Sequence, residues 1–220
     1  MMPLEDSRRR TRPPDANPGL ARVTRRAREG VEANARLTGT TAALLLVLLF
    51  VEGLTILRIG SLLTLHVFVG MLLVPPVLVK MSATMWRFAR YYLGAPEYRR
   101  KGPPPNLLRA LGPIVVVLTV VLFASGIALL LGPPSWQHDL LAVHKGSFVL
   151  WLGAMGLHVL GHLLDTARLA PLDFIARTRR QVRGAAIRQW LLALSLVIGI
   201  GLGVLVVPYV GAWWHAFRLG

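Results

Sequence analysis

Five long apolar segments divide this 220-residue chain. They cover roughly residues 37–57, 61–80, 107–131, 140–164 and 190–209. Each has the ~20 residues, or more, that a helix needs to cross ~30 Å of hydrocarbon. Because the core of a bilayer offers no water, every backbone N–H and C=O in such a segment must bond internally, which favours α-helices. The sequence therefore predicts an all-α protein, an integral membrane bundle of five transmembrane helices.

Basic residues are concentrated in alternate connections between these segments. Of the 25 Lys and Arg residues, 21 lie in residues 1–36, 86–110 and 166–188. This bias is typical of the cytoplasmic side of the inner (plasma) membrane, so the N-terminus is expected inside and the C-terminus outside. A net charge of +15 could also indicate nucleic-acid binding. Its distribution instead favours a role in topology and contact with the lipid bilayer, so no nucleic acid is expected as a partner.

The same pattern predicts how the chain is organised. Residues 1–36 are rich in Arg and Pro, which is typical of a disordered basic cytoplasmic tail. Residues 37–210 form the helical bundle, and residues 211–220 form a short extracytoplasmic tail.

Proline and glycine residues predict local features of two spans. Pro75 and Pro76 are expected to kink the second span, because proline cannot donate a helical hydrogen bond. Gly199, Gly201 and Gly203 are expected to let another helix approach the last span closely.

The chain contains no cysteine and six histidines. The absence of cysteine excludes disulfides, iron–sulfur clusters, thiolate-ligated haem and the covalent attachment of c-type haem. Histidine is then the strongest remaining ligand for a soft metal.

His66 and His144 are predicted to lie at the same depth on two different helices. Each is about five residues inside its apolar segment, counted from the same side of the membrane. Two neutral imidazoles from facing helices are what the iron of a b-type haem requires. Small residues nearby, Gly70 and residues 124–126, would leave space for a flat macrocycle. The alternative is that both histidines only form hydrogen bonds within the bundle.

A further histidine raises the question of a second haem. His158 lies 14 residues after His144, nearly on the same helix face and about 21 Å away along the axis. The matching position on the second span holds Lys80, whose protonated amine is a poor haem ligand and is expected to reach the headgroups. One haem is therefore predicted, and a second is left open. His158 and His162 could otherwise pack in the core, lie on a proton path or neighbour a quinone, while a zinc site would have only Asp165 as a further ligand.

Two charged residues are expected beside the outer histidine pair. Glu52 should share the depth of His66, and a carboxylate inside a membrane points to function. It could orient the N–H of a haem ligand or take a proton from a quinol. The alternative is a protonated side chain that bonds to a neighbouring helix. Lys145, next to His144, could pair with a haem propionate or extend to the surface.

Two of these segments carry a family resemblance. The segment from His144 to His162, HKGSFVLWLGAMGLHVLGH, resembles the paired-histidine helix of bacterial cytochrome b561-like and ferric-reductase-like membrane cytochromes. The segment LHVFVGMLL, residues 65–73, resembles their other ligand helix. The resemblance covers roughly residues 37–210. It implies a haem-binding bundle in which His66 and His144 hold one haem and His158 belongs to a second. The sequence departs from the pattern at Lys80, where a di-haem member would offer histidine.

These observations predict a membrane-bound b-type cytochrome with a bis-His haem b near the outer face. The resemblance implies electron transfer between the quinone pool and a redox partner, such as an extracytoplasmic or membrane oxidoreductase subunit. Haem is the expected cofactor and quinone or quinol a candidate partner, and no catalytic residue is assigned. The alternatives are a transporter or proton channel built on Glu52, Lys80, His158 and His162, and a haem-free scaffold subunit.

Overall fold

Helices account for all the regular secondary structure of the described residues. The structure, a computed structural model, describes residues 18–100, 102 and 106–218, and the side chains among them except those of residues 18, 20, 21 and 212–218. Five helices are long and apolar enough to cross a membrane. They are α1 (Pro18–Ile56), α2 (Ile59–Tyr92), α4 (Asn106–Leu131), α5 (Gln137–Leu169) and α7 (Ala185–Arg218). The prediction of an all-α bundle of five membrane-spanning helices is confirmed, and the chain is a multi-pass membrane protein.

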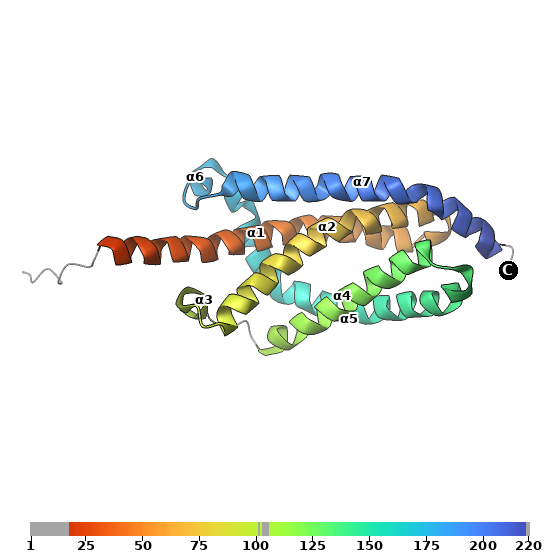
Figure 1. Ribbon diagram of the computed structural model, residues 1–220, viewed down its shortest axis with the longest axis horizontal. Coiled ribbons are helices and arrows are strands. Elements are labelled where there is room, and N and C mark those ends of the chain that lie inside the picture. Colours follow the sequence, from red (N-terminus) through yellow and green to blue (C-terminus); the bar gives the residue numbers. More distant parts are fainter. Residues whose placement is uncertain (1–17, 101, 103–105, 219–220) are drawn as a thin grey trace, which may run out of the picture.

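Short elements connect these helices at the two ends of the bundle. They are α3 (Pro96–Arg100), η1 (Pro134–Trp136), η2 (Ala170–Asp173) and α6 (Ala176–Arg179). The start of α1 lies at the same end as α3 and α6, which we call the basic end (Figure 1). The α1–α2 link, the α4–α5 link and the C-terminal part of α7 lie at the opposite end, which we call the hairpin end (Figure 1).

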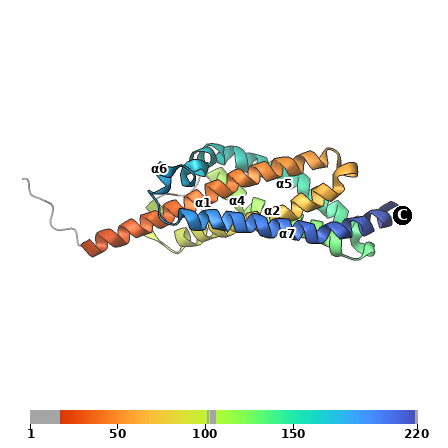
Figure 2. The same cartoon turned by 90° about the horizontal axis from the view of Figure 1, so that it is seen from above.

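The long helices form two packed groups. Helix α2 packs against both α1 and α7, whereas α4 pairs with α5, and α5 contacts α1. The pairing of α4 with α5 and the course of α7 along α2 are visible in two views (Figures 1 and 2). A cluster of Leu45, Val69 and Leu73 lies between α1 and α2, and Phe123 of α4 packs against it. Contact between the two groups therefore reaches the middle of the bundle.

Both ends of the chain are more helical than we expected. Helix α1 begins at Pro18, so residues 18–36 are not a disordered tail, while residues 1–17 lie outside the described part. Two ion pairs stabilise this segment, each between residues one helical turn apart. Arg25 bonds Glu29 at 2.9 Å, and Arg36 bonds Glu32 at 3.2 Å. At the other end α7 continues to Arg218, so most of the predicted C-terminal tail is helical.

The second span continues as one helix through Pro75 and Pro76. The non-helical dihedrals inside α2 occur at Leu62, near its start. Pro76 has no N–H to offer the carbonyl of Leu72, four residues earlier. That carbonyl oxygen lies against α7, where a Cβ added to Gly199 would be 2.5 Å away. The carbonyl oxygen of Leu72 therefore lacks its helical hydrogen bond in α2. Gly199 of α7 lets a Cα–H group approach this oxygen instead.

A second glycine of α7, Gly203, also lies close to α2. A Cβ at Gly203 would lie 2.6 Å from the Phe68 ring, whereas one at Gly201 would meet nothing within 4 Å. Gly199 and Gly203 are one turn apart and face α2 together. The prediction of a close helix approach is confirmed for these two glycines and wrong for Gly201.

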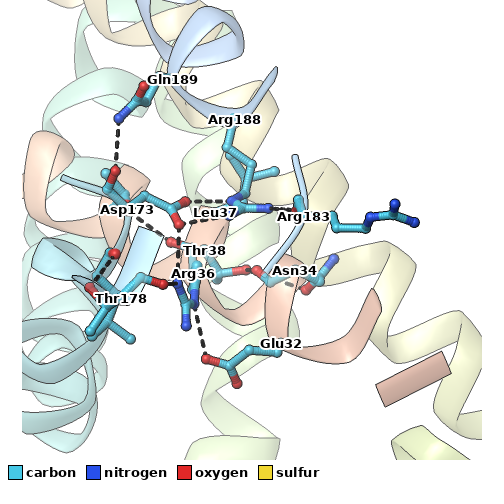
Figure 3. A network of polar contacts seen from close by, with 12 residues as sticks. Glu32, Asn34, Arg36, Leu37, Thr38, Asp173, Thr178, Arg183, Arg188 and Gln189 are labelled. Carbon is cyan, nitrogen blue, oxygen red and sulfur yellow. Dashed lines mark hydrogen bonds and ion pairs between the residues drawn. The ribbon is translucent and has the colours of Figure 1, made fainter. Parts of the chain in front are cut away.

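A buried ion network fixes the connection between α5 and α7 at the basic end. Asp173 of η2 is 2% exposed and bonds Arg36 of α1 and Arg188 of α7, which are 3% and 6% exposed. Figure 3 shows Asp173 between the two guanidinium groups. Arg36 also donates to the carbonyl oxygen of Thr178 at 2.8 Å, and Gln189 to that of Asp173 at 2.9 Å. Three separate segments are therefore held together by one carboxylate.

Candidate functional site

The hairpin end of the bundle holds the two histidines that the sequence singled out. His66 and His144 each lie seven residues beyond the first residue of their helices, α2 and α5. A rise of about 1.5 Å per residue puts both about 10 Å from those helix starts. Their ring centroids are 6.4 Å apart. The two rings are therefore in edge-to-face contact across the bundle.

Two residues of α1 hold the Nδ1 atom of His66. Glu52 Oε1 lies 2.9 Å from this atom, and Thr55 Oγ1 lies 3.0 Å from it. The Thr55 hydroxyl donates to the carbonyl oxygen of Glu52 at 2.6 Å, so its lone pairs are left for the ring. Because both neighbours of Nδ1 accept, the ring proton lies on Nδ1. In the neutral tautomer Nε2 then keeps a free lone pair.

The Nδ1 atom of His144 is held in the same manner by α4. It lies 3.1 Å from Ser125 Oγ and 3.2 Å from the carbonyl oxygen of Leu122. A carbonyl oxygen can only accept, and the Ser125 hydroxyl donates to that same carbonyl at 3.0 Å. The proton of His144 therefore also lies on Nδ1, and its Nε2 is also free to bind a metal.

The spacing of the two rings fits a metal held between them. A metal–nitrogen bond of about 2.0 Å, with about 1.1 Å from nitrogen to ring centre, puts two opposed imidazole centroids about 6.2 Å apart. The observed value is 6.4 Å, with an angle of 82° between the ring planes. Edge-to-face aromatic pairs span about 4.5–7 Å, so distance alone fits both arrangements. The shared tautomer, with Nδ1 engaged and Nε2 free on both rings, favours a pair of ligands.

Two glycines lie beside the histidine pair and its carboxylate. A Cβ added to Gly126 would lie 3.1 Å from Cε1 of His144, and one added to Gly70 would lie 3.5 Å from Oε1 of Glu52. We predicted that these residues admit the edge of a macrocycle. In the structure Gly126 gives space to the His144 ring, whereas a Cβ at Gly70 would make an ordinary van der Waals contact with the carboxylate of Glu52.

The remaining intramembrane histidines form a separate group toward the basic end. The rings of His158 and His162 are 4.8 Å apart on α5. Lys80 donates to the carbonyl oxygen of Thr38 at 2.8 Å, so it is tied to α1 instead of extending to the headgroups. The Nδ1 atom of His158 is buried and has no hydrogen-bond partner among the described residues. Lys80 therefore does not provide a second axial ligand opposite His158.

Other predicted site features are placed as follows. Lys145 is exposed, and no ion pair within the described residues involves it. Within the same residues no group of three or more His, Asp or Glu could hold a metal ion, so a zinc site at His158, His162 and Asp165 is not formed. An axial haem pair needs two protein ligands and is a different arrangement.

Sequence reasoning missed the role of the two hydroxyl groups. Thr55 lies three residues after Glu52, and Ser125 three residues after Leu122, so each shares a helix face with the group it bonds. That spacing is the only signal that could have identified Thr55. Ser125 was expected to matter for its small size, and its hydrogen bond to His144 was not anticipated.

No protein-family model, curated protein or solved structure matches this chain.

Proposed function

We propose that this chain is a membrane-bound b-type cytochrome of the cytochrome b561-like kind, with His66 and His144 as the axial ligands of one haem b. The carrying observation is the matched pair of imidazoles on two helices, 6.4 Å apart, each held at Nδ1 and free at Nε2. When bound, haem supplies a one-electron iron couple, and the protein tunes it through ligands, hydrogen bonds and burial. The protein would thus serve as an electron carrier.

The residues behind the two ligands would make them unequal. A carboxylate that accepts the ligand N–H makes the imidazole a stronger electron donor than a neutral acceptor does. Glu52 does this for His66, whereas His144 bonds only the neutral Ser125 and Leu122 groups. Both sets also hold their rings in place before any ligand arrives, which lowers the entropy lost on binding.

Redox partners follow from the position of the site. The concentration of Lys and Arg at the basic end supports a cytoplasmic basic end in an inner membrane. The histidine pair would then lie near the outer face, within reach of quinol in the bilayer or of an extracytoplasmic oxidoreductase subunit. Glu52, at 13% exposure of its side chain, is the group best placed to take a proton from a quinol.

A proton or ion path remains the competing interpretation. It would have to connect the group around Glu52 with the group around Lys80. Between them Trp151 donates to Thr119 at 2.9 Å, and Thr119 donates to the carbonyl oxygen of Val115 at 2.7 Å. These intervening polar atoms already have partners within the protein, which supports the cytochrome over a continuous path.

Visible spectra test the proposal. The full chain, purified in mild detergent, is expected to give a b-type band in the reduced-minus-oxidised spectrum, with about one haem per protein. His66→Ala and His144→Ala should each abolish the band, because one remaining axial histidine cannot hold the haem in the same six-coordinate state. His138→Ala is the matched control, since His138 is exposed on the same helix as His144. It should leave the band unchanged.

Two results would overturn the assignment. One is a colourless wild-type protein that elutes as a single folded species and gains no b-type spectrum on incubation with haemin. The other is a b-type band that survives in both His66→Ala and His144→Ala, which would place the haem elsewhere.

A further inference from the structure

A cavity at the basic end is lined by arginines that form no ion pair with a carboxylate of the described residues. Its volume is about 460 Å³, and it lies between the η2–α6 link and the first turn of α7. Its lining includes Phe174, Arg179, Arg180, Val182 and Arg183. This cavity is remote from the histidine pair, which lies at the opposite end of the bundle.

The charge around the cavity is unbalanced. No Asp or Glu occurs after Asp173 in the sequence. Asp173 itself is occupied by Arg36 and Arg188, as Figure 3 shows. None of the ion pairs within the described residues involves Arg179, Arg180 or Arg183. Three arginines of the cavity lining therefore have no counter-charge from the described protein.

The surroundings of the cavity match the level of lipid headgroups. The membrane-spanning part of α7 begins at Ala185, which is also part of the cavity lining. Phe174 in the link, and Ile187 and Trp190 in the first turns of α7, are exposed apolar side chains beside the arginines. A tryptophan and basic residues at the end of a span are typical of the boundary between headgroups and acyl chains. The cavity therefore offers cations to a headgroup and apolar contacts to the chains below it.

We propose that this cavity binds the phosphate headgroup of an anionic phospholipid. Guanidinium groups bind phosphate oxygens through paired, charge-assisted hydrogen bonds. The N-terminal turn of α7 adds backbone N–H groups and a positive dipole end toward the same space. The lipid would cover these arginines, which have no carboxylate partner among the described residues because Asp173 is used to join α1, η2 and α7.

Native mass spectrometry of the full chain in detergent tests this site. Phosphatidylglycerol is the probe, and phosphatidylcholine is the zwitterionic comparison. The wild-type protein should retain a phosphatidylglycerol adduct at concentrations where phosphatidylcholine is lost. In a triple variant, Arg179→Gln, Arg180→Gln and Arg183→Gln, the apparent affinity for phosphatidylglycerol should fall about fivefold for each charge removed.

A control variant removes the same charge elsewhere. It carries the substitutions Arg22→Gln, Arg26→Gln and Arg28→Gln, on the exposed start of α1. Arg22 is about 21 Å along the helix from Arg36. This distance exceeds the ~8–10 Å beyond which salt screens the effect of a charge. This control should bind phosphatidylglycerol like the wild type. Thermal melting and gel filtration confirm that both variants are folded.

Two outcomes would overturn the proposal. The first is a triple variant that is folded and keeps the wild-type preference for phosphatidylglycerol. The second is full displacement of the lipid by equimolar glycerol phosphate or inorganic phosphate, which would make the ligand a soluble phosphate. Because no arm of the experiment depends on haem, the outcome is independent of the proposed cytochrome function.

Discussion

Glu52 Oε1 lies 2.9 Å from His66 Nδ1, although the two residues belong to different helices. Their side chains are 13% and 22% exposed, inside a bundle whose outer surface is apolar. A carboxylate in this environment is costly unless it has a strong partner. The bond joins α1 to α2 just inside their hairpin and fixes the tautomer of a candidate haem ligand. It is the contact on which the properties of the proposed haem depend most directly.

Replacing Glu52 should change the redox potential before it changes haem content. In Glu52→Gln the amide oxygen can still accept from His66 Nδ1, but the negative charge that strengthens the imidazole as a donor is lost. The haem should therefore be retained, and its midpoint potential should rise. Glu52→Leu removes the acceptor as well and should weaken haem retention about 10–100-fold. Potentiometric titration and the haem-to-protein ratio measure the two effects.

The control for these variants is Glu29→Gln, on the exposed start of α1. It removes an acidic side chain that pairs with Arg25 far from the histidines. Its potential should equal that of the wild type. Equal potentials for Glu52→Gln and the wild type would show that the carboxylate does not act on an axial ligand.

Gly126 should be the position at which a larger side chain does most damage to His144. Its added Cβ would lie 3.1 Å from the ring, so the larger side chain of Gly126→Leu must displace His144 from its present position. We expect the b-type band to be lost while the helices remain folded. Gly153→Leu on α5 is the control, since an added Cβ there meets nothing within 4 Å. Absorbance and circular dichroism of the two variants distinguish loss of the site from loss of the fold, and a normal band in Gly126→Leu contradicts the proposed ligand.

Sequence reasoning located the histidine pair because depth in a membrane helix follows from counting residues. Each segment has two ends, and the rise per residue is constant, so His66 and His144 could be matched without knowing how the helices pack. Rotation about the helix axis is different. It depends on contacts such as that between Gly199 and Leu72, which the sequence does not reveal, and it decides that Thr55 and Ser125 face the rings.

The ion network at the basic end shows a second limit of sequence reasoning. Arg36 and Asp173 are 137 residues apart, and neither lies in a motif. The basic link before α7 was interpreted through its charge excess, which correctly indicated one end of the bundle. The single aspartate at its start, which organises that link, had no distinguishing pattern around it.

The α2–α7 interface predicts opposite effects for two neighbouring glycines. Gly199→Ala places a methyl group 2.5 Å from the Leu72 carbonyl oxygen, closer than these atoms can approach, so the helices must separate. We expect it to lower the free energy of unfolding by about 1–3 kcal/mol, as overpacking commonly does. Gly201→Ala faces open space and should be neutral or stabilise the helix by up to about 1 kcal/mol. Thermal unfolding in detergent compares them, and equal stability of the two variants would contradict the close approach.

Removing Asp173 should be among the most destabilising single changes in the described chain. Asp173→Ala leaves Arg188 buried without a counter-charge and leaves Arg36 with only its partner Glu32, and breaking a buried pair in this way costs about 3–5 kcal/mol. Glu29→Ala is the comparison, because its partner Arg25 is 79% exposed and exposed pairs contribute about 0–1 kcal/mol. Unfolding free energies in detergent measure both. A loss for Asp173→Ala no larger than that for Glu29→Ala would show that the network is not a structural lock.

His158 provides the test of haem number. Its Nδ1 atom is buried with no partner among the described residues, and the position expected to oppose it holds Lys80, which bonds the Thr38 carbonyl oxygen. If one haem is bound between His66 and His144, His158→Ala should keep the full b-type band and the ratio of one haem per protein. It should also cost little stability, because the substitution removes an unsatisfied polar atom. A wild-type ratio near two that falls by half in His158→Ala would instead mean that a second haem binds toward the basic end, with an axial partner other than the amine of Lys80.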